Sequence, residues 1–269
     1  MTKINIVTPY ELGAMKVRGE KITALTAYDA TFARIEDSAG VDVILVGDSM
    51  GMVIQGYDTT LPVTIDEMVY HTRACSRGIK RAMLVADMPF MSYQASEEMA
   101  LVNAGRCLKE GNAHAIKLEG GETIAPSIRR MVDVGIPVMG HIGMQPQRVR
   151  AYGGYRIQGR HEDAAEQIMR DALAVQEAGA FSVVLEKIPR GLAARITEQL
   201  AIPTIGIASG PDCDGQILVN YDMLGLADQY NFKFVRLYAE LAKDIRTAIG
   251  TYRDDIRSGA FPSADESFE

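Results

Sequence analysis

Short apolar or β-prone runs alternate along this chain with longer segments whose apolar positions recur at helical spacing. Glycine usually follows the helical segments, as is typical of a helix end. Thr8 and Pro9 fit the cap and first position of the earliest helix. The expected strands are 22–26, 41–46, 82–86, 114–118, 137–140, 181–185, 203–207 and 216–219. The expected helices are 10–18, 32–39, 65–76, 97–110, 123–134, 162–178, 190–200 and 232–258.

Eight strand–helix units at roughly 30 residues each use the whole length of 269 residues. This count favours an α/β fold of the closed (β/α)8 TIM-barrel type over the alternative, a doubly wound open sheet. No linker or low-complexity stretch interrupts the pattern. We therefore expect one barrel domain over 1–269, with a short N-terminal helix and a flexible C-terminal tail.

Composition narrows the class of protein. The chain is 47% hydrophobic and 23% charged, which is ordinary for a globular protein. A net charge of −7 without a basic stripe argues against nucleic-acid binding. No apolar run approaches a membrane span, and the N-terminus has no signal-peptide core. Three widely spaced cysteines indicate a reducing compartment, so we expect a cytoplasmic protein.

The segment 43–64 organises the expected site. It begins with four apolar residues that fit a buried strand, and after Gly47 the chain continues with Asp48 and Ser49. An acid in this position lies where parallel α/β proteins bind ligands, because loops after the strands form the crevice. The alternative is that Asp48 caps the next helix.

The acids recur at equivalent places. The expected strands end at or beside the polar residues Asp29, Asp48, Asp87, Glu119, His141 and Glu186. In a barrel the carboxyl ends of all strands meet at one mouth, so these groups would lie close together. Alternation puts Ile44, Val46 and Asp48 on one face of their strand, and Lys117 on the same face as Glu119. Lys187 would face away from the mouth.

Several carboxylates in one mouth repel one another unless a cation lies between them. Magnesium prefers carboxylate and water oxygens, whereas His and Cys are too few here for a zinc centre. We expect Mg²⁺ to be held by Asp48 and Asp87, with Glu119 nearby. The alternative is that each acid caps a helix or pairs with an arginine.

A metal of this kind could chelate a 2-oxo acid and stabilise the enolate formed when the neighbouring carbon loses a proton. Lys117 and Ser49 could hold the carboxylate of the substrate. Glu186 is the candidate base because it lies across the ring from the metal ligands. His141 is the second candidate, although a single histidine at a strand end is more often structural.

Five segments of the chain also resemble a known family. The segments VGDSMGMVIQGYDTTLPVT, VADMPFMSY, IKLEGG, GHIGMQPQ and VLEKIP, in this order and spacing, resemble the 3-methyl-2-oxobutanoate (ketopantoate) hydroxymethyltransferase family. The resemblance runs from about Thr8 to Phe261. It implies a barrel of the phosphoenolpyruvate/pyruvate superfamily. It also implies transfer of a one-carbon unit from 5,10-methylenetetrahydrofolate to 3-methyl-2-oxobutanoate, giving 2-dehydropantoate for pantothenate and coenzyme A synthesis.

The resemblance also implies roles for single residues. Asp48 and Asp87 would bind Mg²⁺ and Glu119 would complete the site. Ser49 with Asp48, together with Asp87 and Lys117, would contact the oxo acid, and Glu186 would accept a proton. The family commonly forms homodecamers.

Two other functions remain open at this point. A lyase or mutase of the same superfamily would keep the acids and the metal and act on an oxo acid without folate. A non-catalytic barrel would keep only the pocket. The departures from the family pattern lie in the second half, where Gly206-Ile207-Ala208-Ser209-Gly210 replaces GIGAG and Phe232-Lys233-Phe234 replaces Pro-Lys-Phe. Lys187 also stands where a small or apolar residue is expected.

Overall fold

Eight parallel strands, each hydrogen-bonded to the next and the last to the first, close into a barrel in the computed structural model, which describes residues 6–227 and 232–268. The (β/α)8 prediction is therefore confirmed and the open-sheet alternative is wrong. The strands are β1 Ile22–Thr26, β2 Val43–Val46, β3 Met83–Asp87, β4 Ala115–Glu119, β5 Val138–Gly143, β6 Ser182–Glu186, β7 Thr204–Ile207 and β8 Gly215–Leu218.

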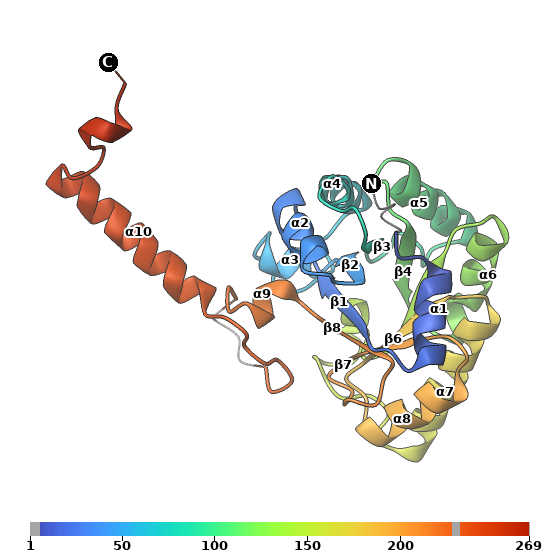
Figure 1. The fold of residues 1–269 in the computed structure, drawn as a ribbon. Coiled ribbons are helices and arrows are strands. Elements are labelled where there is room, and N and C mark those ends of the chain that lie inside the picture. Colours follow the sequence, from blue (N-terminus) through green and yellow to red (C-terminus); the bar gives the residue numbers. More distant parts are fainter. Residues whose placement is uncertain (1–5, 228–231, 269) are drawn as a thin grey trace. The chain divides into compact units, whose positions relative to one another are not determined.

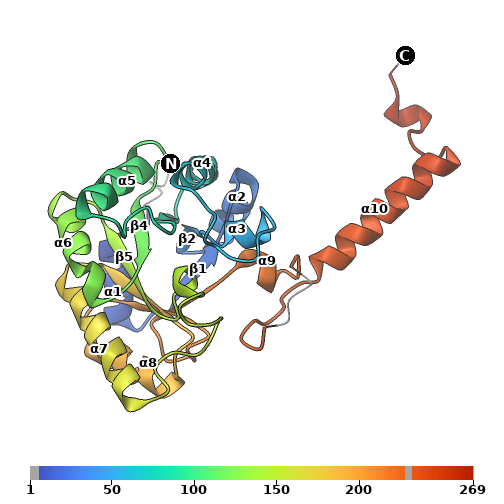
Figure 2. The same cartoon turned by 180° about the vertical axis from the view of Figure 1, so that it is seen from behind.

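Helices surround the barrel strands in both views of the fold (Figures 1 and 2). Thr8, the expected cap of the first helix, accepts a hydrogen bond from the Glu11 N–H. Thr64 forms a capping box with Glu67 at the start of a later helix. The helices of this part are α1 Pro9–Arg18, α2 Ala30–Ser38, α3 Met50–Val53, α4 Ile65–Ser76, α5 Glu97–Lys109, α6 Ala125–Asp133, α7 Glu162–Glu177 and α8 Arg190–Gln199.

The barrel interior is an apolar core to which all eight strands contribute. Paired positions on neighbouring strands share this core, as Leu45, Val85 and Ala115 do. Leu12 and Met15 of α1 join the same cluster, so the N-terminal helix extends the core. Because apolar side chains fill the interior of the barrel, the site forms at the carboxyl ends of the strands.

The phase of β2 differs from the sequence prediction. Val43 and Leu45 belong to the interior core, so Ile44 and Val46 point the opposite way, toward the helices. The prediction extended the alternation through Gly47 to Asp48, but the strand ends at Val46. Asp48 therefore reaches the mouth from the turn after the strand.

Contacts divide the chain into two compact units, residues 1–219 and 220–269, so the expectation of one domain over 1–269 stays a prediction. The second unit contains α9 Asn220–Met223 and α10 Leu241–Ser258. The predicted helix 232–258 is wrong at its start, because α10 begins only at Leu241. The amides of Tyr238, Leu241 and Ala242 instead donate to carbonyls of Met223, Leu224 and Gly225.

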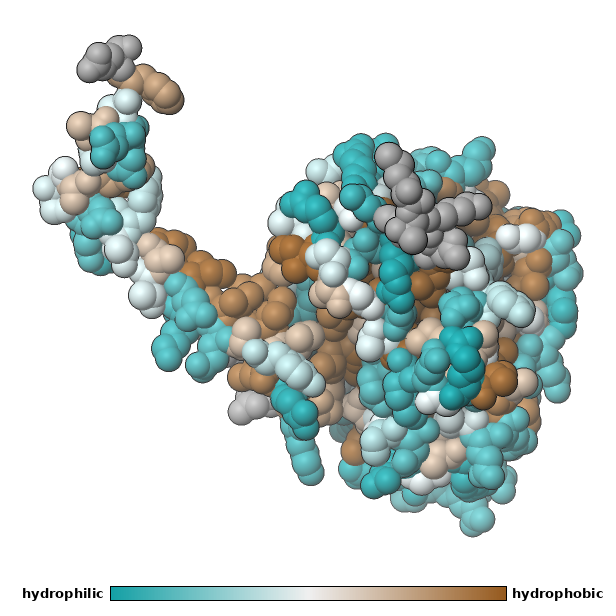
Figure 3. All heavy atoms as spheres, in the orientation of Figure 1, coloured by the Kyte–Doolittle hydropathy of each residue, from teal (hydrophilic) through white to brown (hydrophobic). Residues whose placement is uncertain are grey.

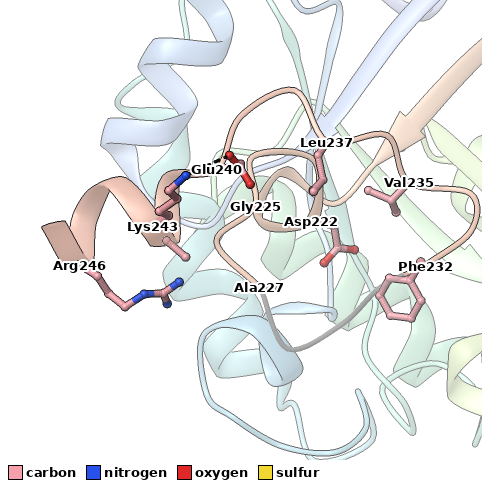
Figure 4. A pocket seen from close by; sticks show the side chains of 10 residues that line it. Asp222, Gly225, Ala227, Phe232, Val235, Leu237, Glu240, Lys243 and Arg246 are labelled. Carbon is pink, nitrogen blue, oxygen red and sulfur yellow. Dashed lines mark ion pairs between the residues drawn. The ribbon is translucent and has the colours of Figure 1, made fainter.

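The second unit has a pocket of its own (Figure 4). Asp222, Phe232 and Leu237 line it, and Glu240 forms an ion pair with Lys243 at 3.9 Å on its rim. None of the predicted site residues belongs to this pocket. Among the described helices, none combines the length and the apolar composition that a membrane crossing requires. The three cysteines are free and buried.

Candidate active site

Strand alternation places the acids of β3 and β4 at the barrel mouth. On β3, Val85 lies in the interior core, so Asp87, two residues later, faces the same way. On β4, Ala115 lies in that core, which turns Lys117 and Glu119 inward as well. All three polar side chains are at most 4% exposed. The prediction that they meet at one mouth agrees with their contacts.

Asp48 approaches Asp87 from the turn after β2. Its backbone N–H donates to Oδ2 of Asp87 at 3.3 Å, and the Asp48 residue is 3% exposed. The helix-cap alternative does not describe this acid, because Ser49 occupies the cap position of α3 and the Asp48 carboxylate accepts from Gln147 instead. The cap interpretation does hold for Asp29, whose Oδ1 accepts the N–H groups of Thr31 and Phe32.

Lys117 is the buried cation of the cluster. Its Nζ lies 2.8 Å from Oδ1 of Asp87 and 3.2 Å from Nδ1 of His141. Burial alone would lower the pKa of Lys117, but the charges of Asp87, Glu119 and Asp48 outweigh burial and raise that pKa above its ordinary value. Lys117 therefore stays protonated, and its contact with the oxo acid stays a prediction.

His141 connects this cluster to Glu186. Nε2 of His141 lies 3.2 Å from Oε2 of Glu186, and its Nδ1 lies 3.8 Å from Oε1 of Glu119. Burial and the positive charge of Lys117 lower the pKa of His141, so the ring is neutral at pH 7. The Glu186 side chain remains 18% exposed, which leaves this carboxylate the most accessible acid of the group.

Ser49 lies beside a buried tyrosine of the neighbouring strand end. Its Oγ is 2.9 Å from the hydroxyl of Tyr28, which follows β1. Gly47 leaves room for this serine, because a Cβ at position 47 would lie 2.8 Å from the Ser49 Oγ. A larger residue at position 47 would therefore have to displace the Ser49 hydroxyl.

The sequence prediction missed two residues of the site, Gln147 and Tyr93. Gln147 donates from Nε2 to Oδ2 of Asp48 at 3.0 Å, and from its backbone N–H to Oε2 of Glu119 at 3.1 Å. The Tyr93 hydroxyl donates to Oε1 of Gln147 at 2.8 Å and accepts the N–H of Glu119 at 3.0 Å. Both residues end motifs that carry the family resemblance, and that position is the only sequence signal for them.

Burial and mutual repulsion disfavour the ionised acids. Burial, followed by the charge of Asp87, raises the pKa of Asp48 to about 7. Burial also raises the pKa of Glu119 well above its usual range; the charges of Asp48 and Asp87 add to this, and Lys117 opposes it. A second positive charge in this mouth would favour the ionised form of every one of these carboxylates.

Within 6–227 and 232–268, no three or more His, Cys, Asp or Glu side chains are arranged as a ready metal centre. Asp48 and Asp87 nevertheless offer the donor chemistry that Mg²⁺ takes, one or two carboxylates supplemented by substrate oxygens. In addition, the buried Oε1 of Glu119 has no hydrogen-bond partner. The residues present therefore fit a hard divalent cation that completes its coordination with substrate and water.

The raised pKa of Asp48 makes a stability prediction. From about pH 4 to pH 7 the unfolded chain loses this proton while the folded chain keeps it, so the free energy of unfolding falls as pH rises. Asp48→Asn removes this loss, because the amide oxygen still accepts from Gln147 and carries no charge. Between about pH 4 and pH 7, the free energy of unfolding of the variant should rise relative to that of the wild type by up to about 4 kcal/mol. Urea denaturation with a chelator present measures it; parallel stability curves for the two proteins would contradict the assignment.

Fold and site together define the class of protein, a (β/α)8-barrel enzyme with acids gathered at the carboxyl ends of its strands. The solved structure of 2,3-dimethylmalate lyase, a PEP mutase/isocitrate lyase superfamily member, superposes with a TM-score of 0.62 and covers 98% of this chain and 89% of that chain. At 18% sequence identity this likeness shows the fold alone.

The family model for ketopantoate hydroxymethyltransferase matches residues 6–264, and the chain belongs to this family. The 3-methyl-2-oxobutanoate hydroxymethyltransferase of Syntrophotalea carbinolica is 57% identical over 261 residues, covering 97% of this chain and 98% of that protein. The enzyme of the same name from Pelobacter propionicus is 58% identical over 262 residues, 97% of each chain. The resemblance is confirmed, and the chain is a transferase enzyme of the pantothenate pathway.

Proposed function

We propose that this enzyme transfers a hydroxymethyl unit from 5,10-methylenetetrahydrofolate to 3-methyl-2-oxobutanoate with the help of Mg²⁺, giving 2-dehydropantoate. One observation carries the proposal. The strand-end residues Asp48, Asp87, Lys117, His141 and Glu186 form a continuous chain of contacts of 3.3 Å or less at one mouth. Acids, a fixed cation and a partly exposed carboxylate are the groups that proton removal beside a ketone requires.

Asp48 and Asp87 would hold Mg²⁺, with Glu119 completing the site. If ionised, the three carboxylates and Lys117 carry three negative charges and one positive charge, which leaves a net charge of −2 beside a neutral His141. A divalent cation neutralises this excess. Bound there, Mg²⁺ would supply Lewis-acid polarisation of the keto group.

The oxo acid would be held by groups on both sides of the metal ligands. Lys117 keeps its positive charge in the buried mouth and would attract the substrate carboxylate. Ser49, placed by the hydroxyl of Tyr28, would donate or accept one further hydrogen bond beside Asp48. These contacts fix the orientation of the ketone, so that its C3 hydrogen is presented to the base.

Glu186 would accept the proton from C3 of 3-methyl-2-oxobutanoate. Its carboxylate is partly exposed, whereas His141 is enclosed between Lys117, Glu119 and Glu186. We therefore assign His141 to orienting Glu186 and not to proton abstraction. C3 then forms a bond to the methylene carbon of the folate. Both carbon–nitrogen bonds of that methylene break and water supplies the hydroxyl group, so the products are 2-dehydropantoate and tetrahydrofolate.

The proposal extends to compartment and assembly. Three buried free thiols fit a cytoplasmic enzyme. A homodecamer follows from the family resemblance, and α10 offers apolar surface for assembly: Ile245, Ile249, Tyr252 and Ile256 recur at helical spacing and are exposed. Figure 3 shows apolar side chains on the surface of the C-terminal unit. Light scattering should give about ten times the chain mass of 29.3 kDa.

One assay tests the transfer. The protein is combined with Mg²⁺, methylenetetrahydrofolate and 3-methyl-2-oxobutanoate, and the expected product is 2-dehydropantoate. A parallel arm omits folate and supplies 2,3-dimethylmalate as a substrate for carbon–carbon cleavage. Cleavage without folate, together with no 2-dehydropantoate, would establish the lyase alternative instead.

A further inference from the structure

Gln147 joins four segments of the barrel mouth through one side chain and one backbone amide. It lies in the 3₁₀ turn Pro146–Arg148 after β5 and is 4% exposed. Its Nε2 donates to Oδ2 of Asp48 at 3.0 Å and to the carbonyl of Met88 at 2.9 Å. Its backbone N–H donates to Oε2 of Glu119 at 3.1 Å. A single residue thereby contacts the ends of β2, β3 and β4.

The chemistry of its partners fixes the orientation of this amide. The carbonyl of Met88 can only accept a hydrogen bond, so the NH₂ group must face it and Asp48. The opposite oxygen accepts from the hydroxyl of Tyr93 at 2.8 Å and from Nε2 of Gln94 at 2.9 Å. Two donors and two acceptor sites are all in use, which is the full hydrogen-bonding capacity of a glutamine side chain. A flipped amide would instead turn its oxygen toward the Met88 carbonyl, which is itself an acceptor.

We propose that Gln147 is a positioning residue that holds the carboxylates of Asp48 and Glu119 in the orientation in which they receive a divalent cation. The inference rests on the proposed function, because it takes the cation site from there. Gln147 engages Oδ2 of Asp48 and Oε2 of Glu119, while the buried Oε1 of Glu119 is left without a hydrogen-bond partner. The residue thus restrains two separate acids, Asp48 through its side-chain amide and Glu119 through its backbone N–H.

A neutral donor suits this task better than a charged one. A lysine or arginine here would itself neutralise the acids and compete with the cation. A glutamate would add a further negative charge and face the Met88 carbonyl with a second acceptor. Glutamine stabilises the ionised carboxylates without cancelling their charge, so the cation still gains the full attraction.

Gln147→Glu tests the inference, because it replaces the NH₂ donor with an oxygen that adds a negative charge, and it keeps the acceptor for Tyr93 and Gln94. Isothermal titration of MgCl₂ into the full-length protein, without substrate, gives the Kd for the metal. The expected result is a Kd raised about 10- to 100-fold, the usual effect of losing a hydrogen-bonding partner of metal ligands. Gln199→Glu is the matched control: it makes the same change at the exposed end of α8, at the opposite end of the barrel, and should leave the Kd unchanged.

Tyr93→Phe provides a second, milder variant in case Gln147→Glu fails to fold by circular dichroism. It removes the hydroxyl that donates to Gln147 and that accepts the backbone N–H of Glu119, and it leaves the two acid side chains and the Gln147 amide chemically unchanged. Its Kd for Mg²⁺ should rise at least about twofold, and restoring the tyrosine should restore binding. Wild-type affinity in Gln147→Glu, or in Tyr93→Phe where the first variant is unfolded, overturns the role of Gln147 alone. A wild-type protein that takes up no Mg²⁺ overturns both the cation site and this inference.

Discussion

Asp87→Asn is expected to lower the rate of 2-dehydropantoate formation by about a thousandfold, the scale on which removal of one preorganised electrostatic group acts. Asp87 combines two functions in this site. It is a proposed Mg²⁺ ligand, and its Oδ1 is the ion-pair partner of Lys117 at 2.8 Å. The amide carries no charge, so it cannot form the ion pair and is a weaker ligand for the cation. Turnover with saturating substrates and increasing MgCl₂ measures the loss.

The same substitution should also destabilise the fold. It leaves the buried ammonium of Lys117 without its closest counter-charge, a change that costs about 3–5 kcal/mol in comparable sites. Activity is therefore compared only between samples that circular dichroism shows to be folded.

Asp29→Asn is the matched control for Asp87→Asn. Asp29 also follows a strand, but it caps α2 with its carboxylate, and asparagine is an equally good cap. Its activity should equal that of the wild type. Equal activity losses in the two variants would contradict a specific role for Asp87, and so would a folded Asp87→Asn variant that keeps wild-type turnover.

Glu186→Gln is expected to lower turnover by about 10²- to 10⁴-fold, because an amide cannot accept the C3 proton. The affinity for Mg²⁺ should remain within about twofold of the wild type, since Glu186 contacts His141 and none of the proposed metal ligands. This separation between turnover and metal binding is what distinguishes a base from a ligand. Product formation and calorimetric titration of the same preparations measure the two quantities.

Glu198→Gln controls for the loss of one negative charge. Glu198 is exposed on α8, near the end of that helix, so its replacement should leave both turnover and metal affinity unchanged. A Glu186→Gln variant with wild-type turnover would remove Glu186 from the mechanism. In that case His141, 3.2 Å away, becomes the candidate base.

Periodicity was enough to predict the barrel and most of the mouth. On β3 and β4 the strands run unbroken to Asp87 and Glu119, so alternation correctly turns these acids and Lys117 toward one another. The number of units favoured closure of the ring, because eight strand–helix units of roughly 30 residues are typical of a (β/α)8 barrel.

Alternation failed where the strand ended before the functional residue. On β2 the last strand residue is Val46, and the glycine turn that follows resets the direction of Asp48. Asp29 was grouped with the other strand-end acids, yet it is a helix cap, because a cap and a ligand share the same sequence position after a strand. Only the three-dimensional partners separate the two uses.

The sequence pattern did not predict Gln147 as a site residue, for a different reason. A glutamine in a polar loop carries no periodic or charge signal, and its partners are 28 to 99 residues away in sequence. The start of α10 at Leu241 was missed because amides just before and at the start of this helix donate to carbonyls at or just after α9, a pairing that helical spacing cannot reveal.

The most direct test of the site at the barrel mouth is proton exchange. NMR follows exchange of the C3 proton of 3-methyl-2-oxobutanoate into deuterated water, without folate. We expect exchange with Mg²⁺, none with excess chelator, and recovery when Mg²⁺ is restored. Exchange that proceeds equally fast with the chelator would contradict an account in which Asp48 and Asp87 act through a bound divalent cation.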